Sequence, residues 1–394
     1  MKIFVTALGK MYGEGGGSAK VSCTMANEFV KHGHDVTLIF ADGRDGKIFY
    51  KVDSRVHCCD LCKFNGERIK YPIKLKIIRE FYRLFGSHLQ TQKVNFDYRK
   101  EYLSKNLKIL YESIKPDVVI SYSLSTSDIY ISKLHIDTPI VTMCHGDPAY
   151  YFKDTPKDVL DVFNTSSVTQ VLLPSYVEHI TKYMPHAKIV VIGNAVPNYR
   201  QQADLSVVKQ TYKIIFVGAL IKRIKQPHII IEAFAKLADK YPNWIVELWG
   251  PEERKSYRME LELRIKKYGL QNRIFIMGPT LDVPVVLQEA DIFAFPSAFE
   301  GFGLALAEGM SMGLPGIGYK SCSGVNELIK DGYNGFLVGE GVEPFAQAME
   351  KLMKDRNLRI VMGQHARESV KKYSYERVWN QWEAMLKGVV KGGV

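Results

Sequence analysis

Long apolar segments are scarce in this chain of 394 residues. The longest unbroken runs, such as Ile189–Ile192 and Ile214–Val217, are far shorter than the roughly 20 residues that an α-helix needs to cross a bilayer. The apolar stretch within residues 1–9 is too short for a signal peptide, and glycines and charges follow it at once. We therefore expect no transmembrane helix and a soluble, cytoplasmic protein.

Cysteine is also sparse, with six residues in the whole chain. The densest group consists of His57, Cys58, Cys59 and Cys62, but no second pair of ligands follows it at a spacing typical of zinc sites. In a reducing cytosol such thiols remain unpaired. The sequence therefore predicts neither a bound metal nor a resident cofactor.

Positive charge, by contrast, is in excess and unevenly spread. The formal net charge is +11, and residues 63–108 hold 12 Lys or Arg against 4 Asp or Glu. A basic stretch of this kind suits nucleic acid, anionic lipid or phosphorylated small molecules. A nucleic-acid binder would interleave aromatic side chains with its cations, but Tyr71, Phe81, Tyr82 and Phe85 recur at the spacing of a helix core. We therefore expect no nucleic-acid partner.

The segment Tyr71–Phe85 within this stretch is amphipathic. Its apolar residues recur at helical spacing, and Lys74, Lys76, Arg79 and Arg83 lie elsewhere around the turn. This pattern is typical of a helix that lies on an anionic membrane surface. An ordinary amphipathic helix, which packs its apolar face on its own domain, has the same pattern. Both interpretations stay open, and region 63–108 is a candidate contact with the inner face of the membrane.

Short β-branched runs alternate with helical patterns from one end of the chain to the other. The strands predicted before residue 194 are Lys2–Ala7, Asp35–Ala41, Asp117–Tyr122, Pro139–Cys144, Thr169–Leu173 and Lys188–Ile192, and the helices are Ser18–His32, Tyr98–Ile114 and Ser175–Met184. After the polar segment Asn194–Ser206, strands are predicted at Lys213–Val217, Ile245–Trp249, Arg273–Met277, Asp291–Phe295, Gly316–Tyr319 and Gly335–Val338. The helices that alternate with these are Pro227–Tyr241, Ser256–Tyr268, Gly303–Met312, Pro344–Lys354 and Leu358–Tyr373.

Strands that alternate with helices form parallel, doubly wound α/β sheets. Two such runs predict two Rossmann-like domains that face each other across a cleft. We expect the first domain to cover residues 1–198 and to include the C-terminal helix 375–394, and the second to cover 199–374. Ligands in such sheets bind outside the carboxyl ends of the strands, so the loops that follow strands are the candidate sites.

A glycine-rich loop follows the first predicted strand. Gly15, Gly16 and Gly17 precede a predicted helix, and Asp42 follows the second strand. This arrangement is close to a dinucleotide-binding fingerprint, although Ser18 occupies the position of its third glycine. The loop indicates close approach of the backbone to a phosphate at a helix N-terminus, and a flexible surface loop is the alternative.

The strongest signal is the segment Pro296–Gly309, which follows a predicted strand and begins a helix of small residues. Glu300 lies in the turn and Glu308 lies in the helix, eight residues later. A carboxylate accepts hydrogen bonds from vicinal hydroxyls, so two carboxylates suit a ligand with two polyol parts, such as the ribose and the hexose of a nucleotide-sugar. Gly301 and Gly303 lie between them and let backbone N–H groups at the helix start approach a diphosphate.

These residues resemble the E-x7-E motif of family 4 of retaining glycosyltransferases, the glycosyl transferases group 1, which have the two-Rossmann GT-B fold. The blocks that begin at Gly313 and Gly324 are similar to the next two blocks of that family, in order and spacing. The stretch Tyr373–Leu386, with Trp379 and Trp382, resembles its terminal helix that crosses back onto the first domain. The resemblance covers nearly the whole chain.

The resemblance implies a role for each matching residue. Glu308 would hold the donor ribose, and Glu300 the hydroxyls of the transferred sugar. The backbone groups of Phe302, Gly303 and Leu304 would contact sugar and phosphate.

Residues of the first domain match the family as well. Gly15, Gly16 and Gly17 match the glycine loop that faces the donor diphosphate. His145, at the carboxyl end of a predicted strand, matches a histidine that contacts the sugar near the reacting carbon. That position favours a functional role over a structural one.

One departure from the family concerns its Gly-Arg pair after the first strand of the second domain. Gly218 is present, but Ala219 stands where the family has arginine. Lys225 matches the family's lysine a few residues on, and either Lys222 or Arg223 could supply the missing charge.

The resemblance implies retention of anomeric configuration and a metal-independent reaction. We expect a hexose or N-acetylhexosamine to pass from a nucleotide-sugar, a UDP-sugar or alternatively GDP-mannose, to a cell-envelope glycan or lipid-linked acceptor. Two other functions stay open. A nucleotide-sugar epimerase of the same fold would need no acceptor, and an NAD-dependent oxidoreductase would use the glycine loop and Asp42.

Overall fold

The computed structural model describes residues 1–13, 16–199 and 201–392. The chain divides into two compact units, one made of Met1–Gly193 with Trp379–Val394 and the other of Asn194–Val378. The first boundary lies a few residues before the expected one at 198. Val196 explains the difference, because its N–H donates to the Tyr373 carbonyl at 2.8 Å and ties this stretch to the second unit.

The first unit contains a sheet of seven parallel strands in the order β3-β2-β1-β4-β5-β6-β7. The strands are β1 (Lys2–Thr6), β2 (Asp35–Phe40), β3 (His57–Asp60), β4 (Val118–Ser121), β5 (Ile140–Cys144), β6 (Val168–Val171) and β7 (Ile189–Val191). Central strands such as β4 and β5 are buried along their whole length, because helices cover both faces of a parallel sheet. β3 was not predicted, and its residues were considered only as possible metal ligands.

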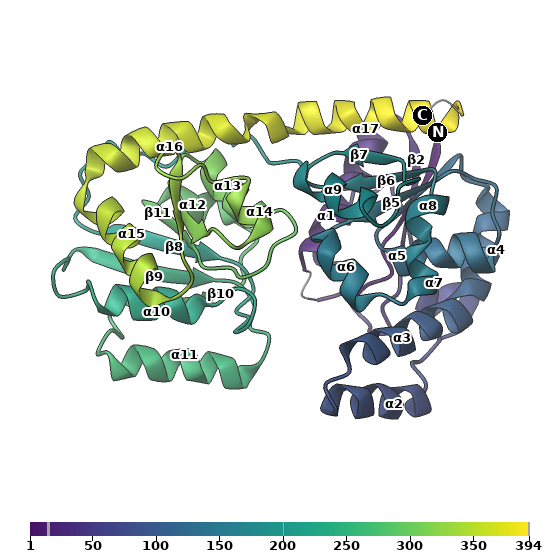
Figure 1. Cartoon of the computed structure of the whole chain (residues 1–394), viewed down its shortest axis with the longest axis horizontal. Coiled ribbons are helices and arrows are strands. Elements are labelled where there is room, and N and C mark those ends of the chain that lie inside the picture. The colour runs from purple at the N-terminus through teal and green to yellow at the C-terminus, as the bar shows by residue number, and fades with distance from the viewer. Residues whose placement is uncertain (14–15, 200, 393–394) are drawn as a thin grey trace. The chain divides into compact units, whose positions relative to one another are not determined.

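The helices of this unit fill the connections between strands (Figure 1). They are α1 (Gly17–Lys31), α2 (Ile73–Leu84), α3 (His88–Tyr98), α4 (Ser104–Ile114), α5 (Leu124–Asp128), α6 (Pro148–Asp154), α7 (Lys157–Leu160), α8 (Val162–Thr165) and α9 (Ser175–Thr181). A π-helical turn, η2 (Arg99–Leu103), joins α3 to α4, so the helix predicted to begin at Tyr98 continues one that begins at His88.

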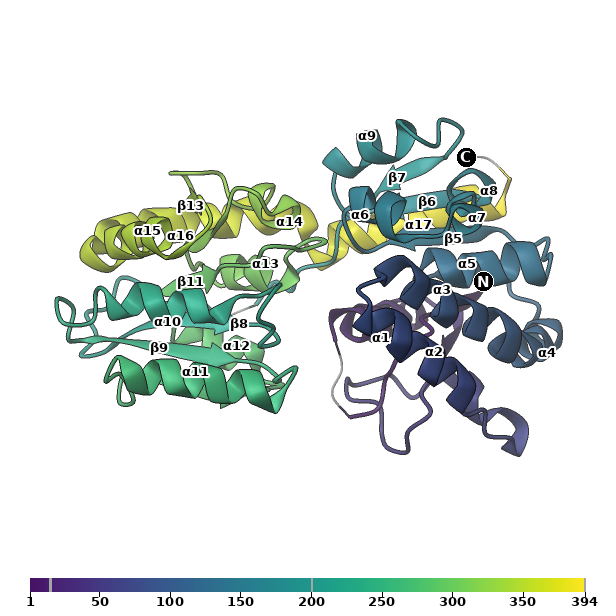
Figure 2. The ribbon, with the colours of Figure 1, turned by 60° about the horizontal axis from the view of Figure 1, so that its bottom comes forward.

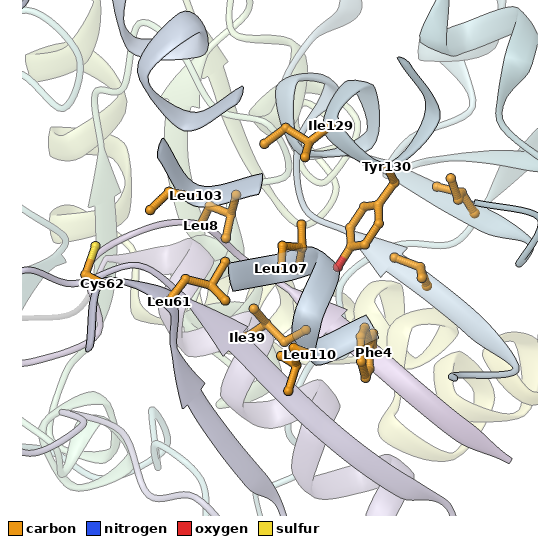
Figure 3. Packing of buried hydrophobic residues seen from close by; sticks show 12 residues of the cluster. Phe4, Leu8, Ile39, Leu61, Cys62, Leu103, Leu107, Leu110, Ile129 and Tyr130 are labelled. Carbon is orange, nitrogen blue, oxygen red and sulfur yellow. The ribbon is translucent and has the colours of Figure 1, made fainter. Parts of the chain in front are cut away.

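Each face of the first sheet has its own core. On one face, Leu103, Leu107 and Leu110 pack with Phe4 and other buried residues (Figure 3). Tyr130 points into the same cluster, and its hydroxyl lies 2.8 Å from Thr6 Oγ1, which satisfies both buried hydroxyls.

On the other face, α1 packs against α17 (Tyr375–Val390), which begins in the second unit and ends in the first. The Phe29 ring lies 5.8 Å from the Trp379 ring and 6.2 Å from the Trp382 ring, both in edge-to-face geometry. His34 Nε2 lies 2.8 Å from Glu383 Oε1. These contacts hold the C-terminal segment on the first unit.

The second unit contains six parallel strands in the order β10-β9-β8-β11-β12-β13. The strands are β8 (Tyr212–Val217), β9 (Trp244–Trp249), β10 (Ile274–Gly278), β11 (Ile292–Phe295), β12 (Gly316–Tyr319) and β13 (Gly335–Val338). The helices are α10 (Pro227–Ala235), α11 (Lys255–Lys267), α12 (Val283–Gln288), α13 (Leu304–Ser311), α14 (Ser323–Asn326), α15 (Val342–Lys354) and α16 (Arg356–Val370). α10 packs beside α11 and α15, whereas α13 packs beside α16 (Figure 2).

The prediction of two doubly wound parallel sheets is therefore confirmed, whereas the cleft between the domains stays a prediction. In both sheets the strand order reverses between two neighbouring strands, β1 and β4 in the first and β8 and β11 in the second. Loops that leave such a pair diverge and open a crevice at the carboxyl edge. Among the described residues, no helix has the length and apolar character that crossing a bilayer requires.

Candidate functional site

The loops that follow β8 and β11 meet at the carboxyl edge of the second sheet. The β8 loop turns tightly, since the N–H groups of Lys225 and Gln226 both donate to the Ile221 carbonyl at 3.0 Å. The Ala298 N–H of the β11 loop donates to the Ile224 carbonyl at 2.8 Å. The reversal point of this sheet thus brings together two segments that are more than 70 residues apart in sequence.

Lys225 and Glu300 form an ion pair across these two loops. Both side chains are mostly shielded from water, and the Lys225 ammonium also lies 5.4 Å from the centre of the Phe295 ring. Shielding strengthens electrostatic interactions relative to the solvent-exposed surface. The site therefore presents a cation and a carboxylate at one point, and these groups are able to bind a phosphate and hydroxyls.

The turn that carries Glu300 depends on two glycines. Gly303 has φ +81°, in the left-handed region that glycine adopts without strain, and it is the N-cap of α13. A Cβ on Gly324 would lie 2.8 Å from Glu300 Cβ and 2.9 Å from the Phe302 N atom. Gly324 belongs to α14 (Ser323–Asn326), so the start of this short helix packs directly against the Glu300 turn.

The N-terminus of α13 can receive an anion. Within the described part of the chain, no side chain caps this helix, so its first N–H groups are open to an anion. Leu304 is the first residue of the helix, and Phe302 is buried with its ring 4.8 Å from the Tyr373 ring. The backbone groups that the sequence predicted for donor contact lie at this terminus.

Glu308 is buried in the second turn of α13. Tyr199 lies nearby, and burial, with a smaller contribution from the Glu308 charge, raises the pKa of its hydroxyl well above the usual range. The tyrosine therefore stays protonated at neutral pH. Tyr199 belongs to the segment between the two sheets, and nothing in its local sequence pointed to the site.

The structure separates the three candidate cations of the β8 loop. Lys222 contacts Glu260 of α11, with its Nζ 2.8 and 2.7 Å from the two carboxylate oxygens. Arg223 is exposed, whereas Lys225 pairs with Glu300. Lys225 is thus the cation that the fold brings to the Glu300 turn, and Lys222 is held by a different acid.

Gly218, at the end of β8, lies against the loop that follows β9. Gly250 of that loop has φ +143°, and a Cβ there would lie 1.9 Å from the Gly218 carbonyl oxygen and 3.2 Å from the Ala219 N atom. The backbone path at Gly218 and Ala219 therefore depends on a residue without a side chain at 250.

His145 follows β5 at the carboxyl edge of the first sheet. Its ring stacks on Tyr122 at 4.7 Å, and none of the described residues lies within hydrogen-bonding distance of the fully shielded Nε2 atom. Burial lowers the pKa of His145 to about 4, so the ring is neutral at pH 7. A neutral imidazole with an unused nitrogen can hydrogen-bond a sugar hydroxyl.

The glycine loop of the first unit leads into α1. Gly16 is the N-cap, and no side chain of the described residues caps the helix. A Cβ on Gly16 or Gly17 would meet no described atom within 4 Å. Gly15, the third predicted glycine, lies outside the described residues. The open N-terminus of α1 and His145 both lie at the carboxyl edge of the first sheet.

Asp42 does not have the free carboxylate that a ribose-binding acid needs. Its Oδ2 accepts hydrogen bonds from the N–H groups of Met11 and Tyr12 at 2.8 Å, and Arg44 contacts both carboxylate oxygens. Burial acts to raise the pKa of Asp42, but the bonds from Arg44, Tyr12 and Met11 hold it below the usual range. Asp42 therefore anchors the β1 loop, which removes the main support for an NAD-dependent oxidoreductase.

Among the described residues, no three His, Cys, Asp or Glu side chains group as metal ligands. His57, Cys58 and Cys59 belong to the edge strand β3, where successive side chains point to opposite faces of the sheet. Burial raises the pKa of Cys59 and of Cys62 to about 11, so these thiols stay protonated at neutral pH.

The decisive comparison concerns the unit that holds Lys225 and Glu300. The family model described as "Glycosyl transferases group 1" matches residues 197–369. This chain belongs to the group 1 glycosyl transferases. It is thus a glycosyltransferase of family 4, as the E-x7-E segment predicted.

Two relatives match this glycosyl transferase along nearly its whole length. One, an "Uncharacterized glycosyltransferase" of Haemophilus influenzae, is 23% identical over 378 residues, which cover 95% of this chain and 97% of the relative. The other, from Campylobacter jejuni, is 25% identical over 377 residues, or 94% of this chain and 95% of the relative. Its name is GalNAc-alpha-(1->4)-GalNAc-alpha-(1->3)-diNAcBac-PP-undecaprenol alpha-1,4-N-acetyl-D-galactosaminyltransferase.

Solved structures show the same fold. Anabaena HepE, solved in complex with UDP and glucose, superposes with a TM-score of 0.73 at 18% identity, over 98% of this chain and 99% of that chain. The fold of this group 1 glycosyl transferase is therefore GT-B, as predicted.

Proposed function

We propose that this group 1 glycosyl transferase moves a hexose or an N-acetylhexosamine from a UDP-sugar to a cell-envelope glycan or lipid-linked acceptor, with retention of anomeric configuration. The observation that carries the proposal is the Lys225–Glu300 pair beside the open N-terminus of α13, with Glu308 buried in the same helix. These groups supply one cation for a diphosphate and two carboxylates for two polyols. The UDP and glucose in HepE and the undecaprenol-linked acceptor in the name of the Campylobacter relative support the two substrate classes.

In this reaction the bond between the anomeric carbon and the donor phosphate oxygen breaks, and the acceptor oxygen bonds to the same carbon. Negative charge develops on the departing nucleoside diphosphate, where Lys225 and the N–H groups of α13 stabilise it. The departing phosphate oxygen takes the acceptor proton on the same face of the sugar. Glu300 would hold hydroxyls of the transferred sugar and Glu308 those of the ribose, so neither acts as a nucleophile. His145 remains the proposed contact to the transferred sugar.

We expect the protein to bind one nucleotide-sugar, and Glu308→Ala to weaken that binding at least tenfold. A buried hydrogen bond to a charged group contributes about 1.5–3 kcal/mol, which corresponds to a factor of roughly 10–100. Calorimetric titration with UDP-hexoses, UDP-N-acetylhexosamines, GDP-mannose and NAD(P) measures this effect. Glu343→Ala is the matched control, because Glu343 forms an exposed ion pair with Lys236.

Two results would contradict the proposal. Binding of NAD(P) alone would assign the function to the glycine loop of the first unit. Interconversion of two UDP-sugars in the absence of any acceptor would favour an epimerase of the same fold.

We also propose that α2 places the enzyme on an anionic membrane surface. Ile73, Ile77, Phe81 and Leu84 on this helix are each more than half exposed, and no residue of α2 is buried. α2 lies beside α3 in both views (Figures 1 and 2). The apolar face of α2 is therefore not packed on its own domain, which was the alternative interpretation of the segment Tyr71–Phe85. Cations flank the exposed face, which is the arrangement that anionic lipid complements.

Sedimentation with phosphatidylglycerol vesicles at low salt tests this proposal. The double variant Ile77→Ser and Phe81→Ser should bind at least tenfold more weakly, since each buried apolar side chain contributes about 1.5–3 kcal/mol. Met259→Ser with Leu263→Ser is the matched control, because both residues are exposed on α11 of the second unit. Equal sedimentation of the parent and the α2 variant would contradict the membrane contact.

A further inference from the structure

A cavity of about 510 Å³ lies in the first unit, and its lining includes none of the residues already assigned to the donor. Its inner wall consists of the segments that follow β1, β2 and β3, and its outer wall consists of α2, α3 and the turn η2. The cavity therefore lies at the carboxyl edge of a parallel sheet, which is where ligands of doubly wound folds bind. Asp42, which the sequence offered as a ribose-binding acid, and Cys62, which it offered as a possible metal ligand, both line the cavity.

The lining of this cavity is strongly cationic. Six cations line it, and they come from both walls: Lys10, Arg44, Lys70, Lys76, Arg79 and Arg99. Asp42 is the one carboxylate in the lining, and it is already bound by Arg44 and by two backbone N–H groups. The charge of the cavity therefore favours an anion with several oxygen atoms.

Several of these cations are available to a ligand. Lys70 and Lys76 form no ion pair with any carboxylate among the described residues. Arg99 donates to Ser125 Oγ, a neutral acceptor, at 3.2 Å, and burial lowers the pKa of its guanidinium. A phosphate group would give Arg99 an anionic partner.

Neutral polar groups line the same cavity. The Tyr71 hydroxyl donates to Asn95 Oδ1 at 3.2 Å, and the Tyr71 and Tyr98 rings lie 4.3 Å apart. Aromatic faces and amide groups beside cations suit a sugar that carries a phosphate better than a bare inorganic ion.

α2 connects this cavity with the exposed apolar face described above. Lys76 and Arg79 line the cavity, whereas the neighbouring Ile77 and the next apolar position, Phe81, are exposed. The same helix thus presents cations on one side and hydrocarbon-binding residues on another. An amphiphile with a phosphate at the start of its hydrocarbon chain matches both.

We propose that this cavity binds the diphosphate group of a lipid-linked acceptor, with Lys70, Lys76 and Arg99 as its main contacts and with the lipid chain along α2. The proposal rests on the function proposed above and specifies the acceptor as a lipid diphosphate. The donor diphosphate is assigned to α13 and Lys225 in the second unit, so the two anionic groups have separate sites.

Calorimetric titration of the full chain with inorganic pyrophosphate, at saturating UDP, tests the cavity while the donor site is occupied. We expect binding to weaken at least tenfold in the double variant Lys70→Ala and Lys76→Ala. The control is Lys74→Ala with Lys108→Ala, which removes the same charge from positions that do not line the cavity and should change affinity less than twofold. Equal losses in both double variants, or no loss in the first, would overturn the proposal.

Farnesyl diphosphate, a short isoprenyl diphosphate, distinguishes a lipid ligand from a free phosphate. It should bind the parent protein at least tenfold more tightly than pyrophosphate, and Ile77→Ser with Phe81→Ser should remove this difference. Equal affinity for the two probes would overturn the lipid part of the proposal. The UDP affinity of each variant is measured in parallel. Loss of UDP binding would contradict the proposed function, whereas loss of diphosphate binding with unchanged UDP affinity concerns the cavity alone.

Discussion

Glu300→Ala is expected to lower kcat/KM for sugar transfer by at least a thousandfold. Glu300 pairs with Lys225 in a shielded turn, so its removal deletes a hydroxyl acceptor and also leaves the ammonium without its partner. Loss of one positioned electrostatic group in an active site costs about 10²–10³ in rate, and the unpaired Lys225 adds to that loss. Initial rates of transfer with the donor identified by calorimetry measure the effect.

Two further variants separate the role of Glu300 in the site from a general effect on folding. Glu300→Gln keeps the shape of the side chain and should recover part of the activity, while Glu343→Gln should retain the parent rate. The unfolding midpoint of each variant is recorded alongside the rates. Full activity of Glu300→Ala in a folded protein would refute the assignment of this carboxylate to the transferred sugar.

Gly250→Ala is expected to destabilise the second unit by about 3 kcal/mol or more. A Cβ at this position would lie 1.9 Å from the Gly218 carbonyl oxygen, and φ is +143°, where side chains other than hydrogen are strained. Overpacking and backbone strain each cost about 1–3 kcal/mol. Urea unfolding followed by tryptophan fluorescence measures the loss.

Gly269→Ala is the matched control for this prediction. Gly269 also has positive φ, +67°, but a Cβ there would meet no atom within 4 Å. This substitution should therefore cost only about 1 kcal/mol, from conformation alone. If the two alanine variants were equally stable, close packing between the β9 loop and Gly218 would not be the reason that position 250 requires glycine.

Gly250→Ala should also weaken UDP binding, since Gly218 and Ala219 lie in the loop that leads to Lys225.

The order of strands and helices was largely predictable because period-2 and period-3.6 patterns are local properties of the sequence. Every strand of the second sheet was predicted within one residue of its observed bounds at both ends. The Glu300 turn was recognised because strand, turn and helix are contiguous. β3 was missed because its cysteines and charged ends resemble a ligand cluster more than a strand. The short helices α5 to α8 were missed because each has too few turns for a periodic pattern.

Within the site, sequence identified the residues of each loop but not their partners. Lys225 was matched to the family's lysine, whereas Lys222 and Arg223 were alternatives for the arginine absent at Ala219. The ion pair of Lys222 with Glu260 on α11 shows that Lys222 is held elsewhere. Tyr199 lies more than 100 residues from Glu308 and has no motif of its own. Such pairings depend on strand order and helix packing.

Patterns along the chain were enough to identify an α/β glycosyltransferase of family 4 and to place Glu300 and Glu308 on one strand-turn-helix segment, because these features depend on residues that are neighbours in sequence. Three properties became visible only in the folded chain: Lys225 pairs with Glu300, Asp42 anchors a loop, and α2 leaves its apolar face exposed beside a cationic cavity. Each of these depends on which side chains of distant segments come within a few ångströms, and therefore on desolvation, pairing and packing that no local pattern encodes.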